Sequence, residues 1–307
     1  MKKGVITSNE RIKYLLSFGF TYDDIIKMYK KSDVLTNFKA KTIERKIYLL
    51  MSYGASKEDI IKMVKSFPRI ITLSEKNITS KFEFLLDFGF QNDDIISINK
   101  RTSFLSTNSF DLLKRKINDL KDIGFSDENI IKIIRAYPST LTLSTMNIIS
   151  KINLFLNLGF SKEETLNIIT KSPQILTISE NNIINKFNSI VSLGFTEKEV
   201  ISIVKKYPSL LSLSIENIIS KVQFYDSIGF HDIIVKCPLY LMMSVRLAYA
   251  RYSFLKDNDI NFDKNHSSKL FLSNSQFEQS YSISSDALLE MYDYDKRQNK
   301  EMKLEER

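Results

Sequence analysis

Apolar residues recur along the chain with the spacing of an amphipathic helix. Ile183, Phe187 and Ile190 stand at positions i, i+4 and i+7, and Ser179 precedes them as a helix N-cap. Gly194 follows at the point where a left-handed residue would end the helix. The pattern therefore predicts an amphipathic helix over residues 179–193.

The same segment returns every 35 residues. Seven of the eight glycines mark the period: Gly19, Gly54, Gly89, Gly124, Gly159, Gly194 and Gly229. A serine N-cap column accompanies most of them: Ser74, Ser109, Ser144, Ser179 and Ser214. The sequence is thus that of a repeat protein, in which each repeat packs only on its neighbours. We expect its function to lie in the array rather than in a pocket.

A second helix is predicted directly after each glycine. Its N-caps are Thr21, Ser56, Ser126, Ser161 and Thr196, with Gln91 and His231 as weaker versions. Three residues later, at the capping-box spacing, stand Asp24, Asp59, Asn129, Glu164 and Glu199. The helix should end at a proline, because proline lacks the N–H and crowds the preceding turn. These prolines are Pro68, Pro138, Pro173 and Pro208. Asp33 and Ser103 replace proline in the first and third repeats, which predicts softer breaks there.

An apolar connector of about six residues follows each proline, for example 209–214. It is too short for an ordinary helix and is predicted to form a 3₁₀ turn that closes the core of the repeat. No partner strands exist elsewhere, so the predicted fold is all-α. We expect a superhelical solenoid, right- or left-handed, of seven units with two α-helices and a 3₁₀ turn each.

The repeats divide the chain into three parts. Residues 1–244 hold the seven repeats, and the seventh is five residues short within its second helix, because Pro238 follows Pro208 by 30 residues. The period is lost beyond Arg251, so residues 245–292 are predicted to cap the last repeat. The tail 293–307 is rich in charges of both signs and is predicted to be disordered or a frayed helix.

The charge and the cysteine content narrow the partner and the compartment. The 44 Lys and Arg residues exceed the 36 Asp and Glu residues, and the net charge of +8 favours an anionic partner. The single cysteine, Cys237, excludes an internal disulfide framework and suits a reducing compartment. There is no apolar run long enough to span a membrane, and no signal or transit peptide is visible. We therefore expect a cytoplasmic or nucleoid-associated protein without a membrane partner.

The sequence offers little support for catalysis. His231 and His266 are isolated, and with one cysteine they form no metal-ligand set of the usual spacing. The repeat glycines do not form a phosphate-binding loop, because an aromatic residue or alanine follows each one. We predict no enzymatic activity, no metal and no cofactor. His231 is expected to cap a helix or face solvent, and Cys237 is expected to pack beside its proline.

The repeat unit itself is similar to that of a known family. The pattern G-F-[ST]-x-x-E-x-x-x-[IV]-[IV]-x-x-x-P-x-[IL]-L-[ST]-[LI]-S is fullest in 159–179 and 194–214, and it resembles the repeat of the mitochondrial transcription termination factor (mTERF) family. Segments 251–255 and 272–281 are similar to the closing segments of that family, so the resemblance covers about residues 8–281. It implies a curved stack of triple-helical units that binds nucleic acid, most often double-stranded DNA and in some members structured RNA. It also implies a mitochondrial location, although the chain departs from the pattern in its shortened seventh unit and in having no visible transit peptide.

Two other families of helical repeats have similar periods. Pentatricopeptide repeats are about as long, but they lack the helix-ending proline followed by L-L-S-L-S. The DNA-reading repeats of plant-pathogen effectors carry paired variable residues in a glycine-containing loop that is missing here. Both rank below the mTERF resemblance.

The first candidate binding surface is on the second helices. Counted from each glycine, positions +8, +11 and +12 cover a sector of about 100° opposite the buried side of the helix. Its candidate residues are Lys62, Lys65, Lys100, Arg101, Lys132, Arg135, Lys171, Lys205 and Lys206, with Lys27, Lys30 and Lys31 in the first repeat. A solvated face, or lysines complementing the C-terminal helix dipole, would also explain part of this pattern. We favour phosphate contact because the acids crowd the N-terminal ends of the helices, which leaves these positions without matching acids.

The second candidate is a column within the first helices: Lys46, Lys81, Lys116, Lys151, Lys186 and Lys221, with Arg11 and Arg251 at the two ends. Eight basic residues in one register could bind phosphates. The column borders the apolar stripe, however, so we favour packed stems whose ammonium groups reach the carbonyls of a neighbouring helix.

These observations predict a monomeric protein that binds double-stranded DNA through a basic face and regulates transcription or its termination. The first alternative is binding to structured RNA, such as ribosomal RNA or an intron. The small number of arginines suits RNA or a DNA interaction of modest specificity. The second alternative is a protein-binding scaffold, which would expose apolar side chains instead of a basic stripe.

Overall fold

The computed structural model describes all residues except 1–9, 32–38, 104, 106–107, 261–266 and 295–307. All regular secondary structure in the described residues is helical, which confirms the predicted all-α class. The chain divides into two compact units, Met1–Leu176 and Thr177–Arg307. The predicted tail falls almost wholly outside the described residues.

The first compact unit contains five repeats. Its first helices are α2 (Glu10–Phe18), α4 (Ala40–Ser52), α6 (Glu75–Phe88), α9 (Phe110–Ile123) and α11 (Thr145–Asn157). Its second helices are α3 (Tyr22–Lys31), α5 (Lys57–Ser66), α7 (Asn92–Arg101), α10 (Asp127–Ala136) and α12 (Lys162–Lys171). The 3₁₀ turns are η2 (Pro68–Thr72), η3 (Pro138–Thr142) and η4 (Pro173–Thr177), the last of which ends at the first residue of the second unit.

The second compact unit contains two repeats and the C-terminal helices. The repeats consist of α13 (Glu180–Ser192), α14 (Glu197–Lys206) and η5 (Pro208–Ser212), followed by α15 (Ile215–Ser227), α16 (His231–Lys236) and η6 (Pro238–Met242). Beyond them lie α17 (Val245–Asp257), η7 (Ser267–Phe271), α18 (Asn274–Tyr281) and α19 (Ser285–Met291).

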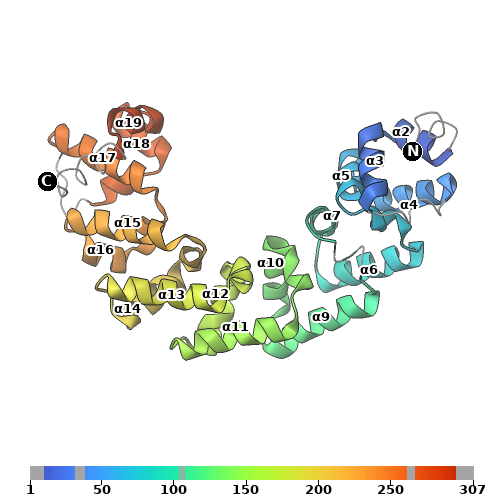
Figure 1. The fold of residues 1–307 in the computed structure, drawn as a ribbon, viewed down its shortest axis with the longest axis horizontal. Coiled ribbons are helices and arrows are strands. Elements are labelled where there is room, and N and C mark those ends of the chain that lie inside the picture. Colours follow the sequence, from blue (N-terminus) through green and yellow to red (C-terminus); the bar gives the residue numbers. More distant parts are fainter. Residues whose placement is uncertain (1–9, 32–38, 104, 106–107, 261–266, 295–307) are drawn as a thin grey trace. The chain divides into compact units, whose positions relative to one another are not determined.

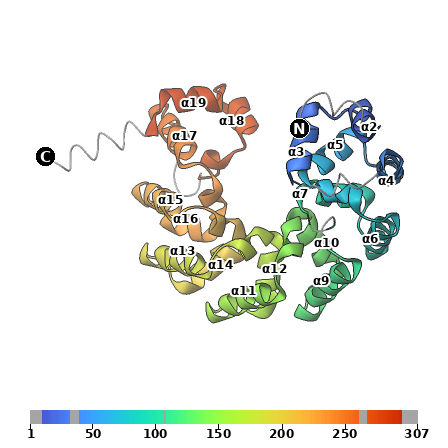
Figure 2. The same ribbon diagram turned by 45° about the vertical axis from the view of Figure 1, so that its right-hand side comes forward.

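Each unit is built from two rows of helices (Figures 1 and 2). In the first unit the second helices α3, α5, α7, α10 and α12 pack on one another in chain order, and first helices pack on first helices. In the second unit, α13, α15 and α17 form one row, and α14 contacts α16. A solenoid of this kind buries its core between the two rows, and the apolar stripe Ile183, Phe187 and Ile190 is accordingly buried.

The glycines end the first helices as predicted. All seven have positive φ, for example 111° at Gly89 and 116° at Gly124. Only glycine adopts this conformation without steric cost. The residue after each glycine then turns inward, and the N–H of Phe90 donates to the carbonyl of Leu85. The 35-residue spacing of the glycines therefore marks where each first helix ends in a residue of left-handed backbone conformation.

Serine and threonine begin most helices, again as predicted. The hydroxyl groups of Ser74, Ser109, Ser144, Ser179 and Ser214 each accept the N–H three residues on. Among the second helices, reciprocal capping boxes join Thr21 to Asp24, Ser56 to Asp59, Ser161 to Glu164 and Thr196 to Glu199.

Two second helices begin differently from these four. At the start of α10, Ser126 accepts the N–H of Asn129, and the neutral Asn129 side chain does not complete a capping box there. At the start of α7 the N-cap is Gln91 rather than serine or threonine, and its backbone N–H donates to Asp94, as the N-cap N–H does in the other capping boxes. Asn129 and Asp94 therefore differ in charge at equivalent positions.

The proline connectors form 3₁₀ turns in five repeats, with the proline in the first position of each. Where Ser103 replaces the proline, α7 ends at Arg101 and Thr102 is buried. Asp33, the other replacement, lies outside the described residues.

The prediction that His231 caps its helix was wrong. Helix α16 has six residues where other second helices have ten, and the deletion moves Phe230 into the N-cap position and His231 into the helix. The His231 ring stacks on Phe195, with ring centroids 4.3 Å apart, and its Nδ1 lies 2.7 Å from a carboxylate oxygen of Asp226.

The C-terminal helices pack on the last repeat. Arg251 of α17 is fully buried and donates to the carbonyl oxygens of Leu270 and Leu272, and its guanidinium lies 4.5 Å from the centre of the Phe277 ring. Phe224 of α15 contacts Tyr249 and Tyr252 of α17 edge-on. These contacts support our proposal that residues 245–292 form a cap.

Candidate nucleic-acid interface

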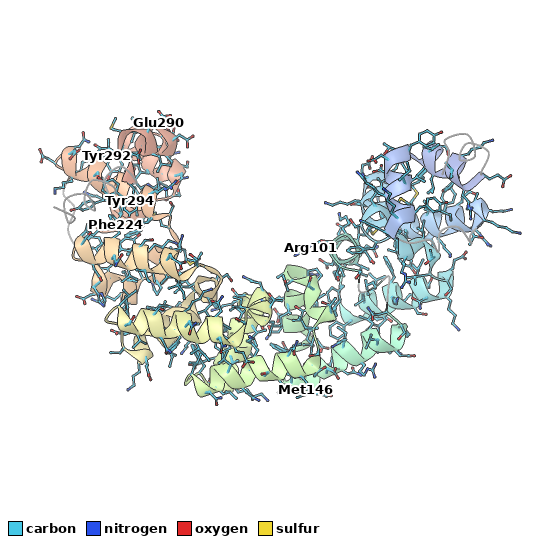
Figure 3. All side chains as sticks on the ribbon, viewed as in Figure 1. Arg101, Met146, Phe224, Glu290, Tyr292 and Tyr294 are labelled. Atoms are coloured by element: carbon cyan, nitrogen blue, oxygen red, sulfur yellow. The ribbon has the colours of Figure 1, made fainter. Side chains whose placement is uncertain are left out.

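Basic residues gather in the last turns of the second helices. The last turns of α3, α5, α7, α10, α12, α14 and α16 contain Lys30, Lys31, Lys65, Lys100, Arg101, Arg135, Lys171, Lys205, Lys206 and Lys236. Of the repeat first helices, only α9 has a basic last turn, with Lys121. In the first unit, Arg101 lies on the row of second helices and Met146 on the row of first helices (Figure 3). We call the exposed surface of the second helices the basic face.

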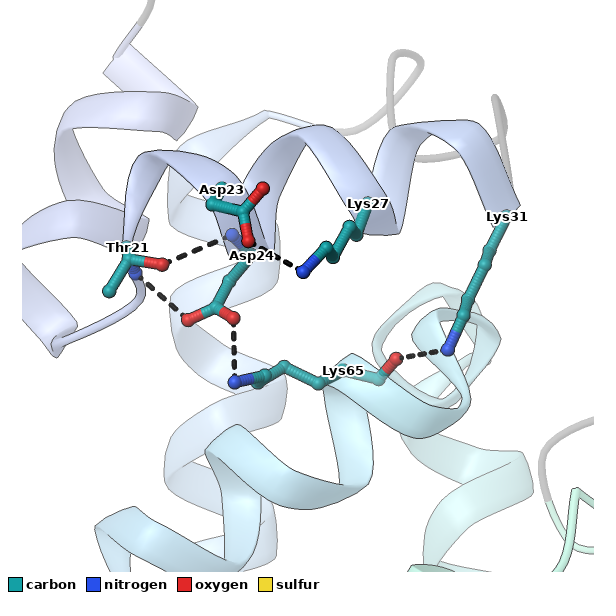
Figure 4. A network of polar contacts seen from close by, with 6 residues as sticks. All are labelled: Thr21, Asp23, Asp24, Lys27, Lys31 and Lys65. Atoms are coloured by element: carbon teal, nitrogen blue, oxygen red, sulfur yellow. Dashed lines mark hydrogen bonds and ion pairs between the residues drawn. The ribbon is translucent and has the colours of Figure 1, made fainter.

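Residues at position +11 of the basic face form ion pairs between adjacent repeats. Lys65 lies 2.6 Å from Asp24, and Lys100 lies 2.6 Å from Asp59. Arg135 pairs in the same way with Asp94, again at 2.6 Å. Each aspartate belongs to the first turn of the preceding second helix, so it both caps its own helix and pairs with the next one (Figure 4).

Residues at position +12 contact the C-terminal end of the next second helix. Lys31 donates to the carbonyl oxygen of Lys65 at 2.8 Å. The guanidinium of Arg101 donates to the carbonyl oxygens of Arg135 and Ala136 at 2.8 and 2.6 Å. Lys206 reaches the carbonyl oxygen of Lys236 at 3.3 Å. These cations satisfy carbonyls that have no partner within their own helix and complement its dipole.

At position +8 the ion pairs form within a single helix. Lys27 and Lys132 pair with the acid four residues earlier on the same helix, Asp23 and Glu128, at 2.6 and 2.7 Å. Such exposed pairs contribute little to stability. Lys62 is exposed and makes no ion pair within the part of the chain that the structure describes.

The expectation that the basic face has no matching acids was wrong. The stacking of repeats brings the aspartates of one first turn beside the +11 residues of the next repeat, 41 positions later in the chain. The pairs do not bury the cations, because the side chains of Lys65 and Arg135 are still 45% and 42% exposed. The face is therefore partly neutralised, but its nitrogen atoms still face solvent.

The ion pairs shift the titration of the aspartates. The hydrogen bond from Lys100, which outweighs the opposing effect of burial, lowers the pKa of Asp59. At Asp24, burial alone would raise the pKa, but the hydrogen bonds from Lys65 and Thr21 together lower it. Both carboxylates are therefore held in their charged form.

The basic face contains a shallow groove between α10 and α12. Its volume is about 660 Å³, and it is lined by Asn129, Lys132, Arg135, Ala136, Asn167, Thr170 and Lys171. Three of these residues are cationic and none is acidic. An arrangement of ammonium, guanidinium and amide groups around an open groove suits a phosphate group.

The column of lysines in the first helices is placed quite differently. Lys46, Lys81, Lys151, Lys186 and Lys221 are buried, and Lys116 is half-buried. Four of these ammonium groups donate to the following connector: Lys81 to Leu105 and Asn108, Lys116 to Leu143, Lys186 to Leu211 and Lys221 to Leu241. Burial lowers the pKa of Lys81 to about 8. Side chains held in this way hold the connectors in place, and we leave them out of the proposed interface.

The structure thus separates the two candidate sets. Within each compact unit the +8, +11 and +12 residues lie on the exposed side of the second helices, although Lys100 is half-buried in its ion pair. Sequence reasoning missed the inter-helix ion pairs and the α10–α12 groove. The recurrence of opposite charges 41 residues apart (Asp24 with Lys65, Asp59 with Lys100) was the available sign of the ion pairs.

The described residues offer neither a metal site nor a membrane span. No three His, Cys, Asp or Glu side chains in the described residues lie close enough together to hold a metal ion. None of the described helices combines the length and the apolar character needed to cross a bilayer.

Comparison with known proteins agrees with the fold and with the repeat pattern. The mTERF family model matches residues 2–118 and 106–278 of the chain. No curated protein matches the chain by sequence. The two family segments overlap and together span both compact units. With its glycine-capped first helices, its proline-initiated 3₁₀ turns and this match over most of its length, the chain belongs to the mTERF family.

Proposed function

We propose that this protein binds double-stranded DNA through the basic face and thereby regulates transcription or its termination. Family membership supports a nucleic-acid-binding role, and the structure supports the surface. The observation that carries the proposal is the gathering of exposed cations in the last turns of the second helices, while the lysines of the first helices are buried. Exposed cations at regular spacing neutralise backbone phosphates.

Apolar exposure distinguishes this proposal from a protein-binding scaffold. Most of the large exposed hydrophobic side chains on the repeats are on first helices: Tyr48, Met51, Met146 and Leu156. Among the second helices, α3 exposes Tyr22 and Ile26, whereas within the described residues α5, α7, α10, α12 and α14 expose none. A surface that is charged and lacks apolar anchors suits a polyanion better than the core of a protein interface.

Structured RNA is the second candidate, because the basic face offers few arginines for reading base edges. Arg101 and Arg135 are its only arginines in the described second helices, and both make inter-helix contacts. Phosphate contact alone does not distinguish one polyanion from another. The choice of duplex DNA first follows the expectation from the family.

The proposal is tested by titrating the full-length protein against labelled duplex DNA and against a labelled RNA hairpin. Both titrations are repeated over a range of salt concentrations. Each phosphate neutralised in B-form DNA changes log K by about −0.9 per unit of log salt concentration. We expect affinity for the duplex to fall steeply with salt, with a slope corresponding to roughly 6 to 10 contacts. Tighter binding to the hairpin with the same salt dependence would shift the proposal to RNA. Salt-independent or undetectable binding to both would contradict it.

A further inference from the structure

One step in the row of second helices lacks the inter-helix ion pair. In the three preceding steps an aspartate at +5 pairs with a lysine or arginine at +11 of the next repeat. Between α10 and α12 the equivalent residues are Asn129 and Thr170, and both are neutral. The Thr170 hydroxyl donates to the carbonyl oxygen of Leu166 in its own helix, so it does not reach across to α10.

The α10–α12 groove lies at this step. Asn129 and Thr170 both line it, together with the three cations Lys132, Arg135 and Lys171. At the ion-paired steps an aspartate carboxylate stands between the helices, and it would repel a phosphate by charge. The amide of Asn129 can donate a hydrogen bond instead. The absence of the ion pair thus leaves a polar space that an anion can enter.

The contacts around the groove favour an anion further. The ion pair with Asp94 holds Arg135 in place through one nitrogen atom at 2.6 Å, and a guanidinium has five N–H donors in all. Ala136, in the groove wall, ends α10, where free carbonyls would repel an anion. Arg101 donates to the carbonyls of Arg135 and Ala136, and so screens this negative helix end.

We propose that the α10–α12 groove seats a backbone phosphate of the bound nucleic acid and is the anchoring contact of the basic face. The inference rests on the proposed nucleic-acid binding and specifies where on the basic face the strongest phosphate contact is made. At the three ion-paired steps, an aspartate at +5 lies between the two helices and competes with a phosphate at the point of contact. At the α10–α12 step the +5 residue is the neutral Asn129, so no carboxylate lies between these two helices, while Arg135 and Lys132 keep their ion pairs with Asp94 and Glu128 outside the groove lining. We therefore place the strongest contact of the row here.

The exchange Asn129→Asp with Thr170→Lys tests the proposal without changing the net charge. It introduces between α10 and α12 the aspartate–lysine ion pair found at the earlier steps, and it places a carboxylate in the groove. The introduced aspartate would also complete a capping box with Ser126, so thermal stability should not fall. The matched control is Asn153→Asp with Asn157→Lys, which introduces the same two charges four residues apart on the exposed side of α11, a first helix, also at constant net charge.

We expect the Asn129→Asp/Thr170→Lys protein to bind duplex DNA about tenfold more weakly, with a salt slope smaller by about one contact. The control protein, altered only on a first helix, should bind as tightly as the wild type. Equal affinity of the wild type and the Asn129→Asp/Thr170→Lys protein, both folded, would overturn the anchoring site while leaving the proposed function intact. Failure of the wild type to bind any nucleic acid would overturn both.

Inorganic phosphate provides the second arm of the experiment, because a free phosphate could use the same groove. Titration of the wild type with phosphate at matched ionic strength, followed by NMR of the Asn129 and Asn167 side-chain amides, detects such binding. We expect only weak shifts, since a single phosphate lacks the neighbouring contacts of a nucleic-acid backbone. A different result would contradict the proposal: phosphate binds the wild type strongly, the double exchange abolishes that binding, and the affinity for DNA is unchanged. The groove would then be a phosphate site that nucleic acid does not use.

Discussion

Lys81 and Lys65 show how differently the same residue type is used in the two helices of a repeat. Lys81 is 2% exposed, and its ammonium group donates to the carbonyl oxygens of Leu105 and Asn108, both at 2.6 Å. Lys65 pairs with Asp24 and keeps nearly half of its side chain in solvent. Lys81 thus holds a connector in place, whereas Lys65 exposes its charge to solvent. Burial, rather than residue type, decides which lysines can meet a ligand.

Replacing Lys81 with methionine should keep the packed stem and remove the donor. Two buried carbonyls would lose their partner, so we expect the free energy of unfolding to fall by about 1 to 3 kcal/mol. Because burial lowers the pKa of Lys81 to about 8, the folded protein releases this proton at lower pH than the unfolded chain, whose value is 10.5. The unfolded chain therefore binds more protons between these values, and the contribution of Lys81 to stability grows as pH rises through them.

Chemical denaturation of both proteins at pH 7 and near pH 9.5 measures this difference. We expect the gap between the wild type and Lys81→Met to widen at the higher pH. A gap that narrows with pH would mean that the charged ammonium, and not the neutral amine, is the form that stabilises the fold.

The glycines allow a second residue-scale prediction. An added Cβ at Gly54 meets no atom within 4 Å, whereas at Gly89 it would lie 3.0 Å from Cδ1 of Ile131. Both have positive φ, so alanine costs about 1 to 2 kcal/mol from backbone strain at either position. We expect Gly89→Ala to lower the melting temperature more than Gly54→Ala. Equal losses would show that Ile131 moves aside freely.

At the scale of helices, the inter-helix ion pairs link each second helix to the next. They also couple the start of one helix to the end of another, since Asp59 caps α5 through Ser56 and pairs with Lys100 of α7. Through this double role, one carboxylate sets both the helix boundary and the register of stacking. The step from α10 to α12 has no such link, and the groove lined by Lys132, Arg135 and Lys171 lies at this step.

Replacing Asp59 with asparagine should cost about 1 kcal/mol at neutral pH, from the loss of the ion pair and part of the cap. The pKa of Asp59 is lowered from 3.8 in the folded protein. Its contribution is therefore present above pH 3.8 and is lost as the pH falls through the lower folded value. Urea denaturation of both proteins should show a gap at pH 6 that closes in strong acid. If the difference in unfolding free energy stayed the same at all pH values, the charged form of Asp59 would not be what stabilises the fold.

The sequence predicted the helix boundaries well because the caps are local features. A glycine with positive φ, a serine before a helix and a proline after one act within a few residues, so Gly124, Ser144 and Pro138 could each be interpreted alone. The pairing of Asp94 with Arg135 could not be found in that way, because it depends on how adjacent repeats stack. The entry of α16 was misjudged for the same reason: the five-residue deletion changes which residue starts the helix.

At the scale of the molecule, residues 245–292 are proposed to protect the end of the array. A chain ending at residue 244 would expose Phe224 and Tyr225, whose rings now contact α17 and η7. We expect that truncation to aggregate, as an uncapped repeat array does. A chain ending at residue 294 is the matched control, because it removes only the charged tail, and it should remain monomeric in analytical ultracentrifugation. A monomeric, fully helical 1–244 protein would show that the segment is not a cap.

The central claim is that the basic face binds nucleic acid, and its location can be tested with two variants of equal net charge. One variant replaces Lys62, Lys132 and Lys205 on second helices with glutamine. The other replaces Lys41, Lys76 and Lys114, which are exposed on first helices, in the same way. Both lose three positive charges, so net charge alone predicts equal effects.

The test is to measure the affinity for duplex DNA as a function of salt concentration, for the wild type and for both variants. We predict that the second-helix variant flattens the slope by about three contacts, one for each lysine, while the first-helix variant changes it by less than about one. Melting temperatures should stay close to that of the wild type, because none of the six lysines is buried. Equal flattening by both variants, or a larger effect of the first-helix variant, would contradict the assignment of the basic face.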